Sequence, residues 1–257
     1  MKDLELVADS GDAVARIFRG AYDFDPRRDD VAFCPEAAMS FAPMVCSLRV
    51  ELPDGTFRPG SGWLAGPRTI VTAGHTLFDR AAGGLAWRVM ATPGPVNGDR
   101  LRTGLRAREV RVAPQWEHRH DRRFDIGCIH LDEPIGHTYG WLRYRALDKA
   151  NLIARNARVA GYPWRRDRGE TLACDTTAIV GADEHRLRFA APVDSGRSGG
   201  PVVMTEAFTK VPLVVGVHDM GFDDLEPLAC DGWDQAMRIS PQIQNLISKW
   251  VAEAPAA

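Results

Sequence analysis

The spacing of apolar residues between positions 43 and 239 most constrains the fold, because they come in short stretches with turn-forming residues between them. Residues 45–51 alternate apolar and polar side chains, as a strand with one face in a core does, and Pro53-Asp54-Gly55 is typical of a hairpin turn. Similar strand segments follow at residues 62–64, 68–71, 109–112, 126–131, 157–161, 172–180, 187–189, 202–204, 213–217 and 236–239. Many short strands and few helical stretches predict an all-β protein of barrels or sandwiches.

The segment after Ser240 has the periodicity of a helix. Ser240 is a suitable N-cap, and Pro241 suits the first helical position. Apolar residues then recur at helical spacing, at Ile243, Leu246, Ile247, Trp250 and Val251. We therefore expect a C-terminal helix.

Residues 1–38 differ in composition from the rest of the chain. Val14, Ile17 and Phe18 suit one face of a short helix, and a charged stretch that contains Pro26 follows. We expect an N-terminal arm that packs on the main domain. A removable or inhibitory pro-segment and a disordered segment remain as alternatives.

Composition narrows the class of protein. The 32 basic and 34 acidic residues leave a net charge of −2, which does not indicate a nucleic-acid partner. No apolar run reaches the roughly 18 residues of a membrane span, so we expect none. The first residues lack the apolar core of a signal peptide, which predicts a cytoplasmic protein, with secretion by another route as the alternative. Five cysteines without a CxxC pair predict buried free thiols rather than a zinc site or a disulfide framework.

One serine lies among glycines, in Gly196-Arg197-Ser198-Gly199-Gly200-Pro201. Glycine lets backbone amides approach a ligand without a Cβ in the way, which is what an oxyanion hole needs. Most stretches of this kind are only turns. Ser198 is a candidate nucleophile if the chain also supplies a base and a carboxylate that orients the base.

His75 and Asp125 are the candidates for those two roles. His75 ends a buried-looking strand in Thr72-Ala73-Gly74-His75, where small residues leave room for an imidazole in a crowded site. Asp125 begins an apolar strand, so its carboxylate is expected to lie half buried at a barrel rim, where it favours the charged form of the imidazole.

These motifs resemble the catalytic motifs of the trypsin-like (chymotrypsin-fold) serine proteases, in the same chain order. The resemblance lies in residues 72–75, 125–127 and 196–201, and it covers about residues 43–252 of the chain. Further segments are similar to the bacterial glutamyl endopeptidase-like branch: Leu52-Pro53-Asp54-Gly55, Gly161-Tyr162-Pro163, Gly216-Val217-His218, and Arg238-Ile239 before the final helix.

The resemblance implies two six-stranded antiparallel β-barrels with a C-terminal α-helix docked on the second barrel, and a site in the cleft between the barrels. The protease domain would comprise residues 39–257, with the first barrel at about 43–140, the second at about 155–240 and the helix at about 241–252. By the same resemblance Ser198 is the nucleophile, His75 the general base and then the acid, and Asp125 its orienter. The backbone amides of Gly196 and Ser198 would form the oxyanion hole.

Two positions depart from the animal enzymes of this fold. Arg197 stands where those enzymes carry an aspartate that pairs with a freed N-terminus, so activation by that ion pair is not available. Thr76 stands where they carry a cysteine after the histidine, so the disulfide beside the base is missing.

The resemblance also implies a primary pocket that includes Val193, His218, Asp219 and Gly221. His218 corresponds to a histidine that binds an acidic side chain in the glutamyl endopeptidases, and an imidazolium there can pair with a carboxylate. Val193 stands where those enzymes carry a hydroxyl, and Asp219 adds a competing negative charge. We expect an acidic P1 residue in the substrate, with a small or apolar P1 residue as the alternative.

The sequence therefore predicts a serine endopeptidase that acts on protein or peptide substrates and needs no cofactor. His118 and His120 lie in a charged loop, where two ligands fall short of a catalytic zinc site, so we expect no metal. Two alternatives remain: a binding module that keeps the fold without turnover, and a protease held latent by residues 1–38 for a specific intracellular partner. The sequence does not indicate an oligomeric state.

Overall fold

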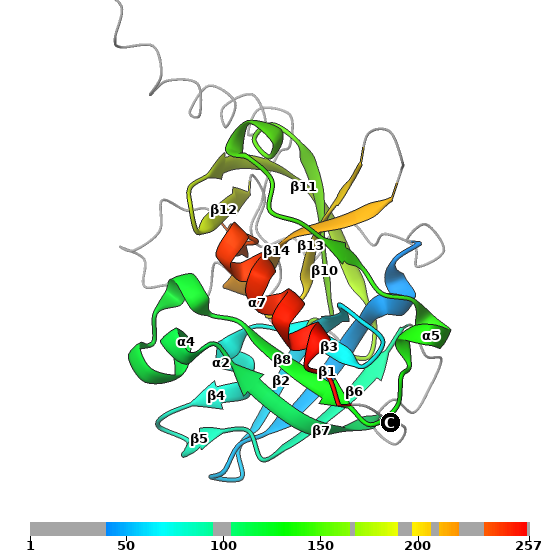
Figure 1. Cartoon of the computed structure of the whole chain (residues 1–257), viewed down its shortest axis with the longest axis vertical. Helices are drawn as coiled ribbons and strands as arrows, with labels where there is room; N and C mark the ends of the chain where they lie inside the picture. The colour runs from blue at the N-terminus through cyan, green and yellow to red at the C-terminus, as the bar shows by residue number, and fades with distance from the viewer. Residues whose placement is uncertain are drawn as a thin grey trace, which may run out of the picture.

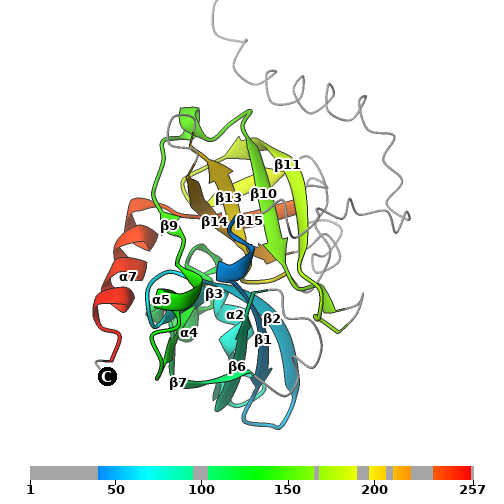
Figure 2. The same ribbon diagram turned by 90° about the vertical axis from the view of Figure 1, so that its right-hand side faces the viewer.

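The computed structural model describes residues 40–94, 104–164, 168–189, 197–206, 211–220 and 234–255. Several features singled out in the sequence lie outside these ranges: the N-terminal segment 1–38, Val193, Gly196, Gly221, Cys34 and Cys230. The described residues form two β-barrels that lie next to each other, as both Figure 1 and Figure 2 show.

Six antiparallel strands close the first barrel. In their order around it they are β1 (Val45–Glu51), β2 (Phe57–Leu64), β3 (Thr69–Thr72), β8 (Gly127–Leu131), β7 (Leu105–Val112) and β6 (Arg88–Pro93). The alternation predicted for β1 is confirmed, because Cys46, Leu48 and Val50 are buried and the residues between them are partly exposed. The predicted hairpin turn joins β1 to β2, with Gly55 in the left-handed region at φ 83°. Of the six strands of this barrel, β6 is the one that no predicted segment covers.

Short elements lie in the loops of the first barrel, just before it, and in the segment that connects it to the second barrel. They are η2 (Ala42–Met44), α2 (Gly74–Leu77), the paired strands β4 (Phe78–Asp79) and β5 (Gly84–Leu85), α4 (Pro114–Arg119), η3 (Arg122–Phe124), α5 (Gly136–Tyr139) and η4 (Lys149–Asn151). Two of them concern the candidate site: α2 follows directly on β3, and η3 comes just before β8.

The second barrel is a ring of six antiparallel strands. In order they are β13 (Pro201–Thr205), β10 (Asn156–Gly161), β11 (Ala173–Ala182), β12 (Arg186–Phe189), β15 (Asp234–Arg238) and β14 (Pro212–Met220), and β14 pairs with β13 to close the ring. A short seventh strand, β9 (Arg143–Tyr144), pairs in parallel with β14. The predicted fold class, two six-stranded antiparallel barrels with a C-terminal helix, is confirmed.

Apolar side chains fill both barrels, and three cysteines are among them. Cys46, Cys128 and Cys174 are buried, and Cys46 and Cys128 are free thiols. Burial raises the pKa of the Cys46 and Cys128 thiols above the ordinary value, because a thiolate is disfavoured away from water. The prediction of buried free thiols is confirmed for Cys46 and Cys128.

The predicted C-terminal helix is α7 (Pro241–Ala252), and its cap is present. The Ser240 hydroxyl accepts a hydrogen bond from the Ile243 amide at 3.3 Å. The helix lies against both barrels in Figure 1, rather than on the second alone as expected. At its last turn, Nε2 of His130 in β8 donates to the Trp250 carbonyl at 3.0 Å, so the first barrel holds the helix end. Among the described helices, none is long and apolar enough to cross a membrane.

Candidate active site

His75 lies in the first turn of α2, where the chain bends after β3. Gly74 lets this turn approach its neighbours closely, because a Cβ on Gly74 would lie 2.8 Å from Cδ1 of Trp116 and 2.9 Å from Oδ1 of Asp125. The small residues before His75 were predicted to make room for its imidazole. In the structure, the lack of a side chain at Gly74 also makes room for the Asp125 carboxylate, which contacts His75.

Asp125 binds His75 twice. Its Oδ1 accepts the backbone N–H of His75 at 2.7 Å, and its Oδ2 is 2.7 Å from Nδ1 of the His75 ring. Only 3% of Asp125 is exposed, so the prediction of a half-buried carboxylate is wrong and the residue is buried. Because an ionised carboxylate only accepts hydrogen bonds, the ring hydrogen belongs on Nδ1 and the lone pair on Nε2. The pair thus orients the imidazole as a base, and the edge of Trp116 packs near the ring with centroids 6.4 Å apart.

The turn before Asp125 is fixed by its own cap. Asp121 accepts hydrogen bonds from the backbone amide of Arg123 at 3.1 Å and from its guanidinium at 2.6 Å. The side-chain hydrogen bond from Arg123 lowers the pKa of Asp121 to about 2, so this carboxyl is ionised at neutral pH. Asp121 therefore stabilises the turn that leads into Asp125.

Arg58 on β2 supports the chain on the other side of His75. Its Nη1 donates to the His75 carbonyl at 2.5 Å, and its Nη2 donates to the Asp79 carboxylate at 2.6 Å. The sequence analysis did not single out Arg58. No local pattern identifies it, because the contact depends on β2 lying beside the turn that follows β3.

Ser198 lies in a turn just before β13, and this turn rests on the first barrel. The Ser198 carbonyl accepts a hydrogen bond from the Ser61 amide at 2.8 Å. Gly199 has φ 87°, and a Cβ there would lie 2.1 Å from Oγ1 of Thr72 and 2.2 Å from the Ser61 carbonyl. Glycine is therefore required at 199 by both conformation and space. The contact with Thr72 places the serine turn against the strand that leads to His75.

Arg197, the residue before the candidate nucleophile, is wholly buried. Its Nη1 forms an ion pair with the Asp175 carboxylate on β11. The sequence analysis noted that Arg197 replaces an aspartate and predicted only the loss of an N-terminal ion pair. The structure adds an ion pair of the opposite arrangement, in which the serine turn supplies the cation and the barrel supplies the anion.

His218 lies beside the serine turn through backbone hydrogen bonds. The Gly199 amide donates to the His218 carbonyl at 2.6 Å, and the His218 amide donates to the Gly200 carbonyl at 2.8 Å. The His218 side chain is buried. The structure thus brings together His75, Asp125, the Ser198 turn and the His218 strand.

Asp219 was expected to bring an unbalanced negative charge to the pocket. Its side chain is buried, and it forms an ion pair with Nη1 of Arg186 on β12. The charge is therefore balanced within the second barrel. Val193 and Gly221, the other two predicted pocket residues, and Gly196 of the predicted oxyanion hole lie outside the described ranges.

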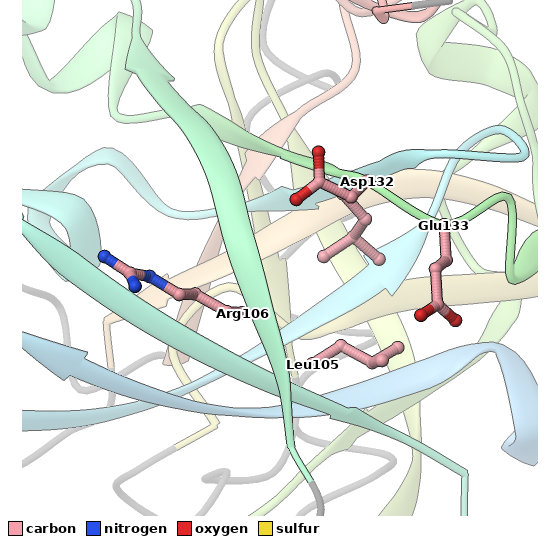
Figure 3. Close-up of a pocket in the computed structure, with 5 residues that line it drawn as sticks. Leu105, Arg106, Asp132 and Glu133 are labelled. Carbon is pink, nitrogen blue, oxygen red and sulfur yellow. The ribbon is translucent and has the colours of Figure 1, made fainter. Parts of the chain in front are cut away.

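A separate shallow hollow of about 190 Å³ lies on the first barrel. Figure 3 shows its lining, with the labelled residues Leu105, Arg106, Asp132 and Glu133. None of the predicted site residues lines this hollow, so we assign no role to it. Within the described residues, no three His, Cys, Asp or Glu side chains group as a metal site would require.

Sequence comparisons with known proteins show the family to which the chain belongs. Residues 60–209, more than half of the chain, match the family model of the trypsin-like peptidase domain. The chain is 26% identical to a glutamyl endopeptidase of Bacillus licheniformis over 193 residues. This aligned stretch is 74% of this chain and 58% of that protein. It is also 26% identical over 205 residues to a Bacillus subtilis protein named extracellular metalloprotease, covering 79% and 62%. The chain thus spans less than two thirds of either relative.

Solved structures show the same fold at lower sequence identity. A Glu endopeptidase in complex with MPD has a TM-score of 0.67 at 18% identity, over 82% of this chain and 92% of that one. A thermostable serine protease, AL20, has a TM-score of 0.64 at 16% identity, over 84% and 100%. The protease Anisep of Arthrobacter nicotinovorans has a TM-score of 0.62 at 16% identity, over 85% and 98%.

Proposed function

This chain belongs to the trypsin-like peptidase family, and we propose that it is a serine endopeptidase that cleaves peptide bonds through Ser198, His75 and Asp125. The observation that carries the proposal is the double contact of Asp125 with His75, at 2.7 Å to the ring and 2.7 Å to the backbone. A carboxylate used only for structure has no need to fix the hydrogen of an imidazole on Nδ1. A base that must accept a proton at Nε2 does need it.

The reaction follows from these positions. The Ser198 hydroxyl attacks the substrate carbonyl carbon while Nε2 of His75 takes its proton, and Asp125 stabilises the imidazolium that forms. The imidazolium then gives the proton to the amine of the scissile bond. The C–N bond breaks, the amine departs, and the acyl group stays on Ser198 as an ester. Water loses a proton to His75 and attacks the ester, and the returned proton restores the Ser198 hydroxyl. The Ser198 amide, with that of Gly196 as the predicted second donor, stabilises the oxyanion.

We propose an acidic P1 residue as the preferred one. Two observations favour it over a small or apolar residue. His218 is buried on the strand that hydrogen-bonds to the serine turn, and the neighbouring Asp219 is paired with Arg186 and so does not compete for an imidazolium. The Bacillus licheniformis relative is itself named a glutamyl endopeptidase.

A fluorophosphonate probe tests the nucleophile. We expect it to label the folded wild type and a Ser248→Ala control, in which a hydroxyl is removed from α7 far from the serine turn. The Ser198→Ala variant should remain unlabelled. Equal labelling of Ser198→Ala, or a folded wild type that is never labelled, would show that the assignment is wrong.

Digestion of a denatured proteome tests the specificity. We expect cleavage after Glu and Asp in the wild type and none with Ser198→Ala. A His218→Gln variant should lose the acidic preference more than it loses turnover of other peptides. Cleavage that clusters after small or apolar residues would support the alternative specificity and leave the triad untouched.

A further inference from the structure

Arg186 connects the two barrels next to the site. It lies on β12, and only 14% of its side chain is exposed. Its Nη1 pairs with Asp219 on β14, the residue after His218. Its Nη2 donates to the Arg122 carbonyl at 2.8 Å, in the turn η3 that leads into Asp125. One guanidinium therefore contacts both the strand of the primary pocket and the turn that positions the triad carboxylate.

We propose that Arg186 is a positioning residue that sets the geometry of Asp125 from the second barrel and neutralises Asp219 beside the primary pocket. This inference rests on the proposed function, because it assigns Asp125 to the triad and His218 to the pocket. The guanidinium suits the task since its planar fork presents donors to two acceptors at once. A point charge such as an ammonium satisfies one of them well and the other poorly.

Electrostatics require a cation at this place. The Asp219 side chain has no exposed surface, and a buried carboxylate without a partner is strongly disfavoured. Burial lowers the pKa of Arg186, whereas Asp125, Asp183 and Asp121 oppose that shift and Arg122 adds to it. Among the carboxylates that oppose the shift, Asp125 raises the pKa of Arg186 most.

Two roles for one side chain can be separated by substitution. Arg186→Lys keeps the charge that balances Asp219 but weakens the hydrogen bond to the Arg122 carbonyl. We expect it to lower kcat for an acidic-P1 peptide by about tenfold, with little change in P1 preference. Arg186→Met removes both contacts and should lower kcat/KM by about 10- to 100-fold and reduce the preference for acidic P1 residues.

The double variant Arg186→Met/Asp219→Asn distinguishes charge from support. It removes the Asp219 carboxylate that would otherwise be buried without its cation, so the P1 preference should return toward that of the wild type while kcat stays low. Each rate is divided by the fraction of molecules that a fluorophosphonate titrates, which excludes losses caused by unfolding. If Arg186→Met fails to fold, Arg186→Lys and Asp219→Asn still report the two roles separately.

The outcomes keep the two proposals apart. Titrated Arg186→Lys and Arg186→Met variants with wild-type kcat and P1 preference would overturn the role of Arg186 and leave the triad standing. A double variant no different from Arg186→Met in P1 preference would overturn the neutralising role. A wild type without labelling at Ser198 would overturn the proposed function itself.

Discussion

The two barrels bury polar groups in different ways. In the described part of the first barrel, buried polar residues are hydroxyls together with one aspartate and one histidine: Ser61, Thr69, Thr72, Thr76, Thr92, Asp125 and His130. The second barrel also buries a hydroxyl and a histidine, Thr177 and His218, but it adds buried and nearly buried charges: Asp175 with Arg197, Asp219 with Arg186, and Arg238. His75 is thus held by hydrogen bonds to one carboxylate, whereas the turn of Ser198 and the strand of His218 are held by ion pairs.

This difference has an energetic consequence. Removing one partner of a buried ion pair leaves a charge without compensation, which costs more than losing the pair as a unit. Removing the carboxylate that orients a histidine leaves the fold intact and changes the tautomer. Substitutions in the first barrel should therefore impair catalysis without unfolding, and those in the second should do both.

The largest effect is expected for Asp125→Asn, in the first barrel. An amide has one acceptor oxygen where the carboxylate has two, so it cannot accept both the backbone N–H and the Nδ1 hydrogen of His75, and kcat should fall by about 10⁴-fold. The urea midpoint should change little. Asp132→Asn is the matched control, because 69% of that side chain is exposed and it lies outside the candidate site. A loss of tenfold or less would contradict the assignment of Asp125.

Arg197→Met should have the next largest effect, now on stability. It leaves Asp175 buried without its cation, and the free energy of unfolding should fall by about 3–5 kcal/mol in urea denaturation. The double variant Arg197→Met/Asp175→Asn should recover much of this loss. A single variant as stable as the wild type would remove the distinction between the two barrels.

Ser240→Ala should have a smaller effect. The alanine leaves the Ile243 amide without its cap, which costs about 1 kcal/mol of unfolding free energy. Ser248→Ala on the same helix removes only an exposed hydrogen bond between the Ser248 and Tyr144 hydroxyls, and it should lower the free energy of unfolding far less. Because α7 contacts both barrels, we expect one cooperative transition in each variant, and two separate transitions would mean that the barrels unfold independently.

Asp121→Asn should show the smallest effect, and only in acid. The folded pKa of Asp121, about 2, lies below the ordinary 3.8, so its stabilisation is complete above pH 3.8 and is lost as the pH falls toward 2. Between these values the wild type should lose more unfolding free energy than the variant. Urea midpoints measured across this range would reveal it, and parallel curves would contradict it.

The sequence was sufficient where the decisive neighbours are local. Alternation in residues 45–51, the turn around Gly55 and the motifs at His75, Asp125 and Ser198 each carry their signal within a few residues. β6 was missed because Arg88–Pro93 has little apolar alternation, with a partly exposed Met90 between Val89 and Ala91. The triad therefore remains a prediction from motifs, with the His75–Asp125 contact as its support.

The ion pairs of the second barrel had no such local signal. Arg186 on β12 pairs with Asp219 on β14 because only β15 separates these two strands in the barrel. No short segment of the sequence predicts that strand order. Arg197 meets Asp175 because the serine turn folds back toward β11. A charged residue in a strand is therefore predicted to lie on the surface when its ion-pair partner is distant in the sequence.

The hydrogen bond from His130 to the Trp250 carbonyl also bears on the timing of folding during synthesis. All the strands of the first barrel have been translated once residue 131 is made, yet the acceptor of that bond is added more than a hundred residues later. In a growing chain, β8 therefore lacks this hydrogen bond until Trp250 has been added. The hydrogen bond between His130 and Trp250 therefore forms only after the whole of the second barrel, including Ser198, has been made.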